Sequence, residues 1–382
     1  MIPFELSDEQ RTIQETARKF AKKEIAPIAI EMDERNEFPR YVFNKMAEVG
    51  FSGMLLPTDY GGAGMNYVSF ALAFQELNKA PGGIASCIVP HTGQGLMINQ
   101  FGNDQQKRKF IPPLAKGEKL GAFALTEPDV GSDAGAVSST AILDGDHYML
   151  NGNKRFITNG GEAEQYLVIA RTGLKIKGYK GLSALIVTKD LPGFTFGKKE
   201  NKMGCRVLLT GSPIFEDCPV PKENLLGEEG QGMMIAMELL NYARITAAIS
   251  GVAISQAAFE IAVSYAKERI QFSRPIAQFQ AIQLMLADMS IQIETAENLL
   301  YSICNLIDNG SSNPSVVAML KVFASDMAVN VTSDAVQILG GYGYMREYQV
   351  EGYMRDAKLL QIADGTNQIQ RLFIARHLLS EF

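Results

Sequence analysis

The chain has 382 residues, 46% of them hydrophobic and 20% charged, which is the composition of an ordinary globular protein long enough for two or three domains. Its net charge of −6 argues against nonspecific nucleic-acid binding, which needs a basic surface, although local Arg residues and backbone N–H groups can still hold an anionic cofactor. The four cysteines and three histidines lack the spacing of a disulfide framework or a metal site, so we expect neither.

The distribution of apolar residues argues against a membrane protein. No uninterrupted apolar run reaches the roughly 18 residues that a membrane-crossing helix needs. The first ten residues also lack the charged and then apolar pattern of a signal peptide. We therefore expect no membrane insertion and a cytoplasmic location.

The first third of the chain has a helical pattern. Ser7, followed three residues later by Gln10, predicts a capping box, and residues 11–30 place their apolar side chains on one helical face. Further helical patterns cover residues 46–54, 67–78 and 105–114. The Gly-rich run at residues 59–64 predicts a loop.

The pattern changes to short strands at about Gly121 and back to helices at Gly232. Residues 147–152, 165–171 and 182–188 predict strands, and frequent glycines between them favour a β-sandwich or barrel-like domain. Long helices are then predicted at residues 232–268, 279–309, 314–339 and 365–379, which would pack as a four-helix bundle. We expect an α+β fold with an N-terminal helical domain (1–120), a middle β domain (121–231) and a C-terminal bundle (232–382).

A carboxylate stands at the start of the most informative segment. Asp364 is followed by Gly365, Thr366, Asn367 and Gln368, and then by an apolar helical stripe. Asp before such a stripe is also a good helix N-cap for purely local reasons. In isolation this segment therefore favours a cap over a functional group.

Five other segments carry polar, aromatic or Gly-rich turns. Residues 123–133 read as a strand entering a Gly/Ser turn, residues 156–160 place an aromatic before Thr and Asn, and residues 241–244 place Asn and Arg three apart. Residues 269–280 begin with Arg, and residues 337–343 end a helix in a Gly-rich turn. Each has a plain alternative when taken alone: a strand and turn, a core aromatic, a solvated helix face or a helix end.

Together and in this order, the segments resemble the acyl-CoA dehydrogenase family over essentially the whole chain. The resemblance implies that family's fold, FAD as cofactor, an acyl-CoA thioester as substrate, and electron-transferring flavoprotein as electron acceptor. It also implies a homotetramer built as a dimer of dimers, in which neighbouring subunits share each FAD.

The resemblance also assigns roles by position. Asp364 is the implied catalytic base. A guanidinium such as that of Arg269 suits phosphate oxygens, and an aromatic face such as that of Phe156 can pack on a flavin ring. The residues expected to bind FAD are Phe123, Leu125, Thr126, Gly131, Ser132, Phe156, Ile157, Thr158, Arg269, Phe272, Ile276, Gln280, Gln337, Ile338, Gly340, Gly341, Thr366 and Gln368. The residues expected to contact acyl-CoA are Ser132, Asn241, Tyr242, Arg244, Ala363 and Gly365.

This chain departs from the family pattern at several positions. The family usually has Glu where Asp364 stands, preceded by a bulky residue where Ala363 stands. Gly is usual at Ser273, and Asp is usual at Asn241. Some relatives place their catalytic Glu where this chain has Ala243, so that alternative base is absent.

The resemblance implies dehydrogenation of an acyl-CoA between its α and β carbons. Asp is shorter than Glu by one methylene, roughly 1.5 Å of reach. With the small Ala363 beside it, Asp364 predicts a wide pocket for a bulky acyl group, such as branched or alicyclic cyclohexanecarboxyl-CoA. The alternatives are a short-chain (butyryl-type) dehydrogenase, a 2-enoyl-CoA reductase running in reverse and, least favoured, a nonenzymatic binder of flavin or acyl-CoA. His91 is expected to be a plain loop residue, with a place near the acyl pocket as the alternative.

Overall fold

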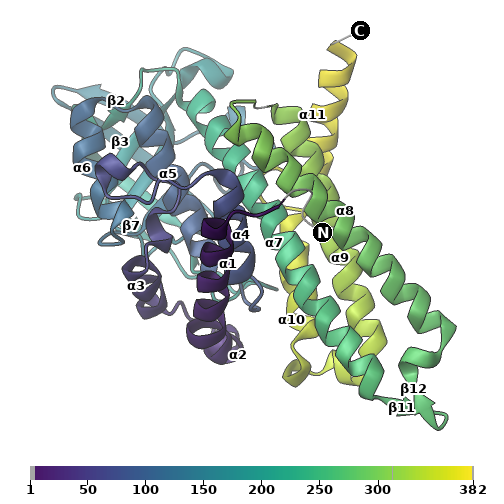
Figure 1. Cartoon of the computed structure of the whole chain (residues 1–382). Coiled ribbons are helices and arrows are strands. Elements are labelled where there is room, and N and C mark those ends of the chain that lie inside the picture. Colours follow the sequence, from purple (N-terminus) through teal and green to yellow (C-terminus); the bar gives the residue numbers. More distant parts are fainter. Residues whose placement is uncertain (1–4, 312, 381–382) are drawn as a thin grey trace.

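The computed structural model describes residues 5–311 and 313–380 (Figure 1). Residues 1–4, on which the expectation about a signal peptide partly rests, lie outside this range. The helices of the first part are α1 (Asp8–Phe20), α2 (Ala29–Arg35), α3 (Arg40–Glu48), α4 (Tyr67–Leu77), α5 (Ile88–Phe101) and α6 (Asp104–Ala115).

The start of α1 confirms the predicted capping box. The Ser7 hydroxyl accepts from the N–H of Gln10 at 3.1 Å, and the Gln10 side chain accepts from the N–H of Ser7 at 3.0 Å. The prediction of one continuous helix over residues 11–30 was wrong. A π-helical turn (Ala21–Ile25) and a 3-10 turn (Ala26–Ile28) separate α1 from α2. Pro27 lies in the second turn, and it has no N–H for the α-helical bond to residue 23.

Two other N-terminal expectations change in the structure. The helical pattern at residues 46–54 continues only to Glu48, because the chain turns at Gly50 with a left-handed φ of +83°. The structure also adds α5, a helix that the sequence patterns did not identify. The predicted helices at residues 67–78 and 105–114 are confirmed as α4 and α6.

The middle part is confirmed as a β region, and its strands form a mixed sheet. In the described residues this sheet has eight strands in the order β10-β6-β5-β2-β3-β9-β7, with β1 pairing β5 in parallel. Its strands are β1 (Gly121–Ala124), β2 (Thr140–Asp144), β3 (His147–Asn153), β5 (Gln165–Arg171), β6 (Leu182–Thr188), β7 (Phe194–Phe196), β9 (Pro213–Pro221) and β10 (Leu225–Leu226). The pair β4 (Ile157–Thr158) and β8 (Thr210–Gly211) forms a separate small sheet.

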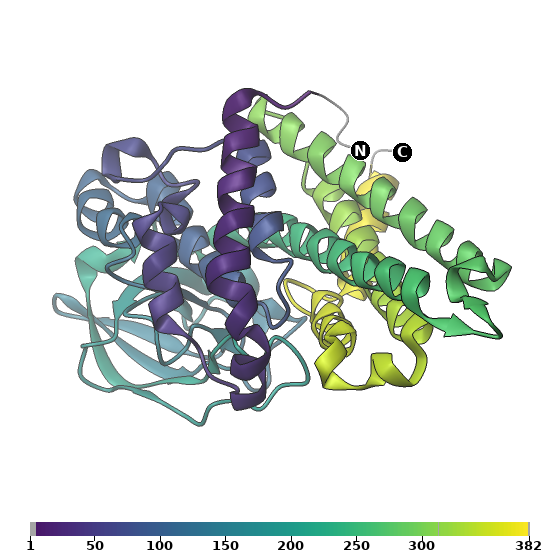
Figure 2. The ribbon, with the colours of Figure 1, turned by 60° about the horizontal axis from the view of Figure 1, so that its bottom comes forward.

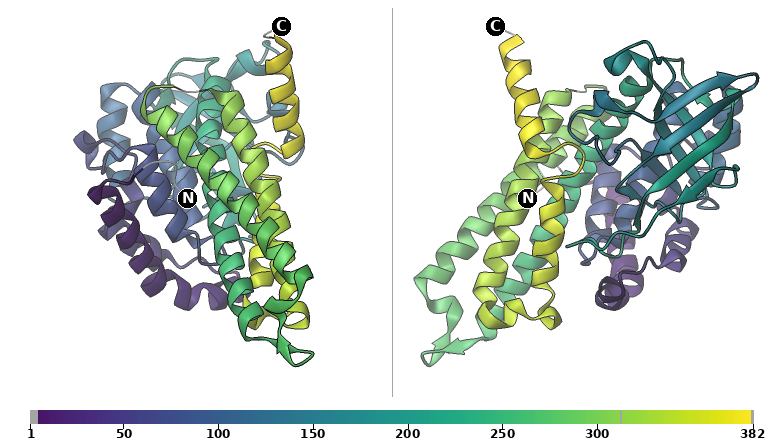
Figure 3. Two further views of the ribbon diagram at one scale, coloured as in Figure 1. Left: turned by 45° about the vertical axis from the view of Figure 1, so that its right-hand side comes forward. Right: turned by 180° about the vertical axis from the view of Figure 1, so that it is seen from behind.

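The last part is a helical bundle, as expected, with a different fourth helix. Its helices are α7 (Gly232–Glu268), α8 (Gln280–Asp308), α9 (Pro314–Leu339), α10 (Val350–Leu360) and α11 (Asn367–Ser380). The helix predicted at residues 365–379 is α11, which packs mainly on α9 and projects beyond the bundle (Figure 3). The fourth position is taken by α10, which packs against both α7 and α9. A hairpin of β11 (Ile270–Gln271) and β12 (Arg274–Pro275) joins α7 to α8.

The long helix α7 joins the three parts of the molecule. It packs along α9 in the bundle and also against α4, α5 and β6. Figure 2 shows the N-terminal helices in front of the sheet, with the bundle extending away from both. The carboxylate of Asp308, at the end of α8, accepts from the N–H groups of Tyr67 and Val68 at 2.7 and 3.0 Å and so holds the start of α4.

Two of these helices pass a length and composition test for crossing a membrane. They are Gly232–Glu268 and Pro314–Tyr344, with 78% and 61% of the most apolar window buried inside the structure. Core helices of soluble proteins pass the same test. These two helices pack inside the bundle, which explains their apolar character. They are therefore weak evidence for a membrane protein.

Candidate active site

Asp364 lies in a tight turn between α10 and α11. Its φ is +57° and that of Gly365 is +89°, so two successive residues adopt left-handed conformations. Such a conformation is uncommon for a residue with a side chain and must be held by its surroundings. The alternative that Asp364 caps α11 was wrong: the helix begins at Asn367, and the Thr366 hydroxyl accepts from the N–H of Ile369 at 3.3 Å.

Side chains from three helices hold the backbone of this turn. The carbonyl of Asp364 accepts from Arg244 Nε on α7 and from Gln370 Nε2 on α11, both at 3.3 Å. The carbonyl of Gly365 accepts from Lys321 Nζ on α9 at 3.0 Å and from Gln370 at 3.3 Å. Arg244, Lys321 and Gln370 are all buried, so the turn is fixed by groups that water does not reach.

Burial and neighbouring charges shift the pKa values of Asp364 and Lys321. Burial raises the pKa of Asp364, and the positive charges of Lys321 and Arg244 oppose this without cancelling it. Burial likewise lowers the pKa of Lys321 to about 8, against the attraction of Asp364. A carboxylate with raised proton affinity, fixed in place by a rigid turn, is suited to remove a proton from a weakly acidic carbon.

The residues predicted to contact the substrate gather mostly around this turn. Arg244 donates from Nη1 to Asn241 Oδ1 at 2.8 Å, as their spacing of three on one helix allows. Tyr242 is buried next to them, and its ring lies 6.0 Å from that of Phe70 on α4. Ala363 directly precedes Asp364 and is partly buried. Ser132 instead lies exposed on the loop after β1.

The two predicted flavin segments of the β region are adjacent in space. The N–H of Arg155 donates to the carbonyl of Thr126 at 2.9 Å, which places residues 123–126 beside residues 156–158. The Phe156 side chain is 58% exposed, on a backbone with φ of +58°. Thr126 and Thr158 are partly buried, while Phe123, Leu125 and Ile157 pack into or against the core.

A buried ion pair behind these segments was missed by the sequence analysis. Lys154 Nζ donates to Glu127 Oε1 at 2.7 Å and to the carbonyl of Leu125 at 3.0 Å. The other oxygen of Glu127 accepts from the N–H and hydroxyl of Ser138 at 2.7 and 2.6 Å. The available signal was one Glu shortly after the strand that ends at Ala124 and one Lys directly after the strand that ends at Asn153.

The remaining predicted FAD residues lie elsewhere in the chain. Arg269, Phe272, Ile276 and Gln280 follow α7, at the end of the bundle away from the sheet (Figure 1). There the Arg269 guanidinium lies 5.2 Å from the ring centre of Tyr342 in the Gly-rich segment. Phe272 is 89% exposed, and Ser273, at the usual Gly position, has φ of +66°. This end also carries Gln337, Ile338, Gly340 and Gly341, whereas Thr366 and Gln368 flank the Asp364 turn.

One chain therefore does not bring the predicted FAD residues together. Most of them form one group on the β region and another at the far end of the bundle (Figure 1), and Thr366 and Gln368 lie beside the Asp364 turn. Added side chains at Gly131, Gly340 and Gly341 would meet nothing within 4 Å, so the backbone at both places is open to an approaching molecule.

His91 is not the loop residue that was expected. It lies on α5, fully buried, and its Nδ1 accepts from the N–H of Gly121 at 3.0 Å. Burial lowers its pKa to about 4, so the ring is neutral near pH 7. Its ring meets that of Phe43 edge-on at 5.3 Å. His91 thus fastens α5 to the start of β1.

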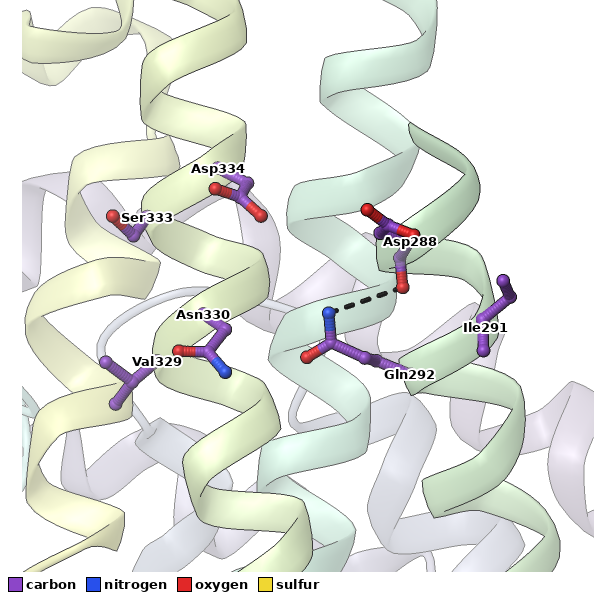
Figure 4. Close-up of a pocket in the computed structure, with 7 residues that line it drawn as sticks. All are labelled: Asp288, Ile291, Gln292, Val329, Asn330, Ser333 and Asp334. Atoms are coloured by element: carbon purple, nitrogen blue, oxygen red, sulfur yellow. Dashed lines mark hydrogen bonds between the residues drawn. The ribbon is translucent and has the colours of Figure 1, made fainter. Parts of the chain in front are cut away.

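A surface pocket between α8 and α9 lies away from this turn. Figure 4 shows acidic and amide side chains from the two facing helices, with Gln292 donating to the carbonyl of Asp288 at 3.3 Å. Its lining residues are Asp288, Ile291, Gln292, Val329, Asn330, Ser333 and Asp334. Asp334 is 13 residues along α9 from Lys321, which corresponds to about 20 Å of helix. None of the predicted site residues lines it.

Known proteins of one family are similar to the whole chain. Family models described as acyl-CoA dehydrogenase N-terminal, middle and C-terminal domains match residues 7–118, 122–218 and 230–379. The chain is 48% identical over 375 residues to an acyl-CoA dehydrogenase of Bacillus subtilis (strain 168), covering 98% of this chain and 99% of that one. It is 44% identical to an acryloyl-CoA reductase (NADH) of Anaerotignum propionicum, covering 99% and 96%.

The solved structures show the same relationship. Butyryl-CoA dehydrogenase from Megasphaera elsdenii superposes with a TM-score of 0.96 at 42% identity, covering 99% of this chain and 100% of that chain. Three family models in order and several full-length relatives thus agree with the fold. The chain belongs to the acyl-CoA dehydrogenase family.

Proposed function

We propose that this protein removes hydrogen from the α and β carbons of an acyl-CoA thioester, with Asp364 as the base for the α-proton. The observation that carries the proposal is the Asp364 turn. Its carboxyl has a raised pKa and sits on a left-handed backbone that Arg244, Lys321 and Gln370 hold from three helices. Enzymes of this family are FAD-dependent oxidoreductases.

The residues on the β region fit a flavin. Phe156 presents an exposed aromatic side chain beside Thr158, and the open backbone at Gly131 and Ser132 allows close approach of polar ligand atoms. FAD, when bound, supplies the acceptor for the hydride from the β carbon. Asp364 holds the α-proton once it is removed, and a hydrogen bond to the thioester oxygen would stabilise the developing enolate.

Replacement of the base tests this assignment. Asp364→Asn should lower kcat by at least about 100-fold, because a positioned acid or base contributes on the order of 10² to 10⁴. FAD absorbance should stay close to wild type. Asp288→Asn, in the pocket of Figure 4, is the matched control and should keep full activity. An Asp364→Asn enzyme as active as wild type would show that Asp364 is not the base.

The acyl group that we propose is bulky, either branched or alicyclic. Because Asp364 is short and Ala363 is small, they leave room for a bulky acyl group. The α carbon must then lie closer to the backbone for the Asp364 carboxylate to reach its proton. Steady-state kcat/KM should therefore favour cyclohexanecarboxyl-CoA over butyryl-CoA. Preference for butyryl-CoA would support the short-chain alternative, which the similarity to a butyryl-CoA dehydrogenase favours. Asp364→Glu should shift the preference toward butyryl-CoA, because the longer base reaches the carbon of a smaller acyl chain.

A second candidate function is reduction of a 2-enoyl-CoA. The observation in its favour is 44% identity to a protein named acryloyl-CoA reductase. In that direction Asp364 returns a proton to the α carbon. Anaerobic mixing of the reduced flavoprotein with enoyl-CoA, compared with mixing of the oxidised protein with acyl-CoA, measures both rates. A faster reductive half-reaction with acyl-CoA supports the dehydrogenase.

Electron-transferring flavoprotein as partner and a homotetrameric assembly complete the proposal. The support for assembly is that the predicted FAD residues around Arg269 lie apart from those on the β region, so we infer that a second subunit brings the Arg269 group to the β-region group. Arg269→Ala should release FAD while leaving the Asp364 turn unchanged. Bound FAD per chain measures the release, and sedimentation velocity measures the oligomeric state. Retention of all FAD by a monomeric protein would contradict a shared site.

A further inference from the structure

Lys321 on α9 is a buried charged residue that the proposed reaction does not itself use. Its side chain is completely buried, and Nζ donates to the Gly365 carbonyl at 3.0 Å and to Asn367 Oδ1 at 2.8 Å. An ammonium group in such a place is costly unless hydrogen bonds and an opposite charge compensate for its lost hydration. These two neutral acceptors supply hydrogen bonds but no negative charge.

The charged groups that face Lys321 are Asp364, Asp326 and Arg244. Asp326 is already engaged: its two oxygens accept from Gln361 at 2.7 Å, from Asn367 at 2.8 Å and from Arg371 at 2.6 Å. Arg244 is itself a buried cation and repels the ammonium. Asp364 is therefore the carboxylate left to balance Lys321.

Lys321 also helps to hold the backbone of the Asp364 turn. A left-handed φ at a non-glycine residue such as Asp364 is strained and persists only when neighbours hold it. Lys321 and Gln370 both bind the Gly365 carbonyl, directly after Asp364. Ser325 and Asp326 fix Asn367 from the same helix, at 2.8 Å each, so α9 holds the turn and the start of α11 as one unit.

We propose that Lys321 is a positioning residue for the reaction: it holds the Asp364 turn in place, and its buried charge favours the ionised, proton-accepting form of the Asp364 carboxyl. The proposal rests on the proposed function, in which Asp364 is the base. It predicts that removal of the Lys321 charge makes Asp364 harder to ionise.

The pH profile of kcat/KM tests this proposal on the FAD-loaded enzyme. Lys321→Met should move the acid limb upward by about 1 pH unit or more, since a nearby opposite charge lowers a carboxyl pKa by about 1–3 units. Lys321→Arg keeps the charge and should leave the limb near its wild-type position, with a lower plateau from imperfect geometry. Ser325→Ala is the matched control, because it disturbs Asn367 on the same helix while Lys321 stays charged. It should not move the limb.

A second measurement needs no Lys321 variant and no activity. If Lys321 and Asp364 attract each other, charged Lys321 stabilises wild type but has no carboxylate to attract in Asp364→Asn. The gap in unfolding temperature between the two proteins should therefore shift in favour of Asp364→Asn as the pH rises through about 8, where Lys321 loses its charge. Differential scanning calorimetry of the holoenzyme from pH 6 to 9.5 measures the gap, and this result decides the matter if Lys321→Met does not fold.

The outcomes separate the two proposals. An unmoved acid limb in folded Lys321→Met, or an Asp364→Asn stability gap that does not change with pH, overturns the role of Lys321. In that case an inactive Asp364→Asn enzyme still supports Asp364 as the base. An active Asp364→Asn enzyme overturns the proposed function itself.

Discussion

At the residue scale, the conformation of Asp364 and Gly365 depends on side chains that are distant in sequence. A Cβ at Gly365 would lie 2.4 Å from Gln370 Nε2, the group that binds both carbonyls of the turn. The φ of +89° adds strain for any residue with a side chain. Gly365 is therefore required by backbone conformation and by a close contact.

Gly365→Ala should lower kcat/KM by about 100-fold, the usual consequence of misplacing a catalytic group by about 1 Å. Gly310→Ala is the matched control, because Gly310 also has a left-handed φ of +78° but an added Cβ there meets nothing. The control should lose about 1 kcal/mol of stability and no activity. Urea unfolding measures the stability of both variants, and steady-state kinetics measures their kcat/KM. Equal activities of the two variants would show that the contact with Gln370 does not matter.

At the scale of elements, the Lys154–Glu127 pair fastens two strand segments together. Glu127 precedes the turn at Gly131, and Lys154 directly precedes Arg155 and Phe156. Burial opposes the charge of Glu127, but Lys154 and the serines at 138 and 139 outweigh it and lower its pKa to about 2. The stability that this carboxylate contributes is complete above its ordinary pKa near 4.5 and is lost as the pH falls toward 2.

Lys154→Met should destabilise the protein by about 3–5 kcal/mol at pH 7, because it leaves a buried carboxylate without its cation. FAD affinity should fall as well, because the two flavin segments lose their connection. The control Arg35→Met breaks the exposed pair with Glu31 and should cost less than about 1 kcal/mol. Guanidinium unfolding at pH 7 and titration of FAD into apoprotein provide the measurements. A Lys154→Met protein as stable as this control would contradict the prediction.

At the scale of the whole molecule, Asp356 on α10 joins the three parts of the chain. Its carboxylate accepts from the N–H of Gly82 at 2.7 Å in the N-terminal part and from the N–H of Cys205 in the β part. The neighbouring Arg355 pairs with Asp33 at 2.9 Å. Burial raises the pKa of Asp356 to about 6, although the two N–H donors oppose this shift.

A raised pKa means that the folded protein favours the protonated form of Asp356. This contribution to stability is complete below pH 3.8 and is lost as the pH rises through about 6. Asp356→Asn cannot accept from both N–H groups without opposing one of them, so it should cost about 1–3 kcal/mol. Urea unfolding at several pH values measures this loss in the free energy of unfolding, which should shrink as the pH rises from 4 to 7. A cost that grows over this range would mean that the two donors outweigh burial.

Much of the fold was predictable because its signals are local. The capping box of Ser7, the strands at residues 165–171 and 182–188, and helices α7 to α9 follow from side-chain periodicity and turn residues. The missed elements have weak local signals. The helix α5 is buried around most of its surface and contains Pro90, Gly93 and Gly95, and α10 is short and starts at a left-handed Gln349. Their helical form depends on tertiary packing, which periodicity does not report.

The sequence by itself determined the order of helical, β and helical parts, the family, and the identity of Asp364 as the candidate base. These follow from residues that are close together along the chain. Only the tertiary structure decided what surrounds that carboxyl, because Arg244, Lys321 and Gln370 come from three helices and meet through packing alone. It likewise decided that His91 fastens a helix to a strand and that the predicted FAD residues around Arg269 lie apart from those on the β region. Burial and charge at a site depend on contacts between distant segments, and those contacts leave no local pattern in a single sequence.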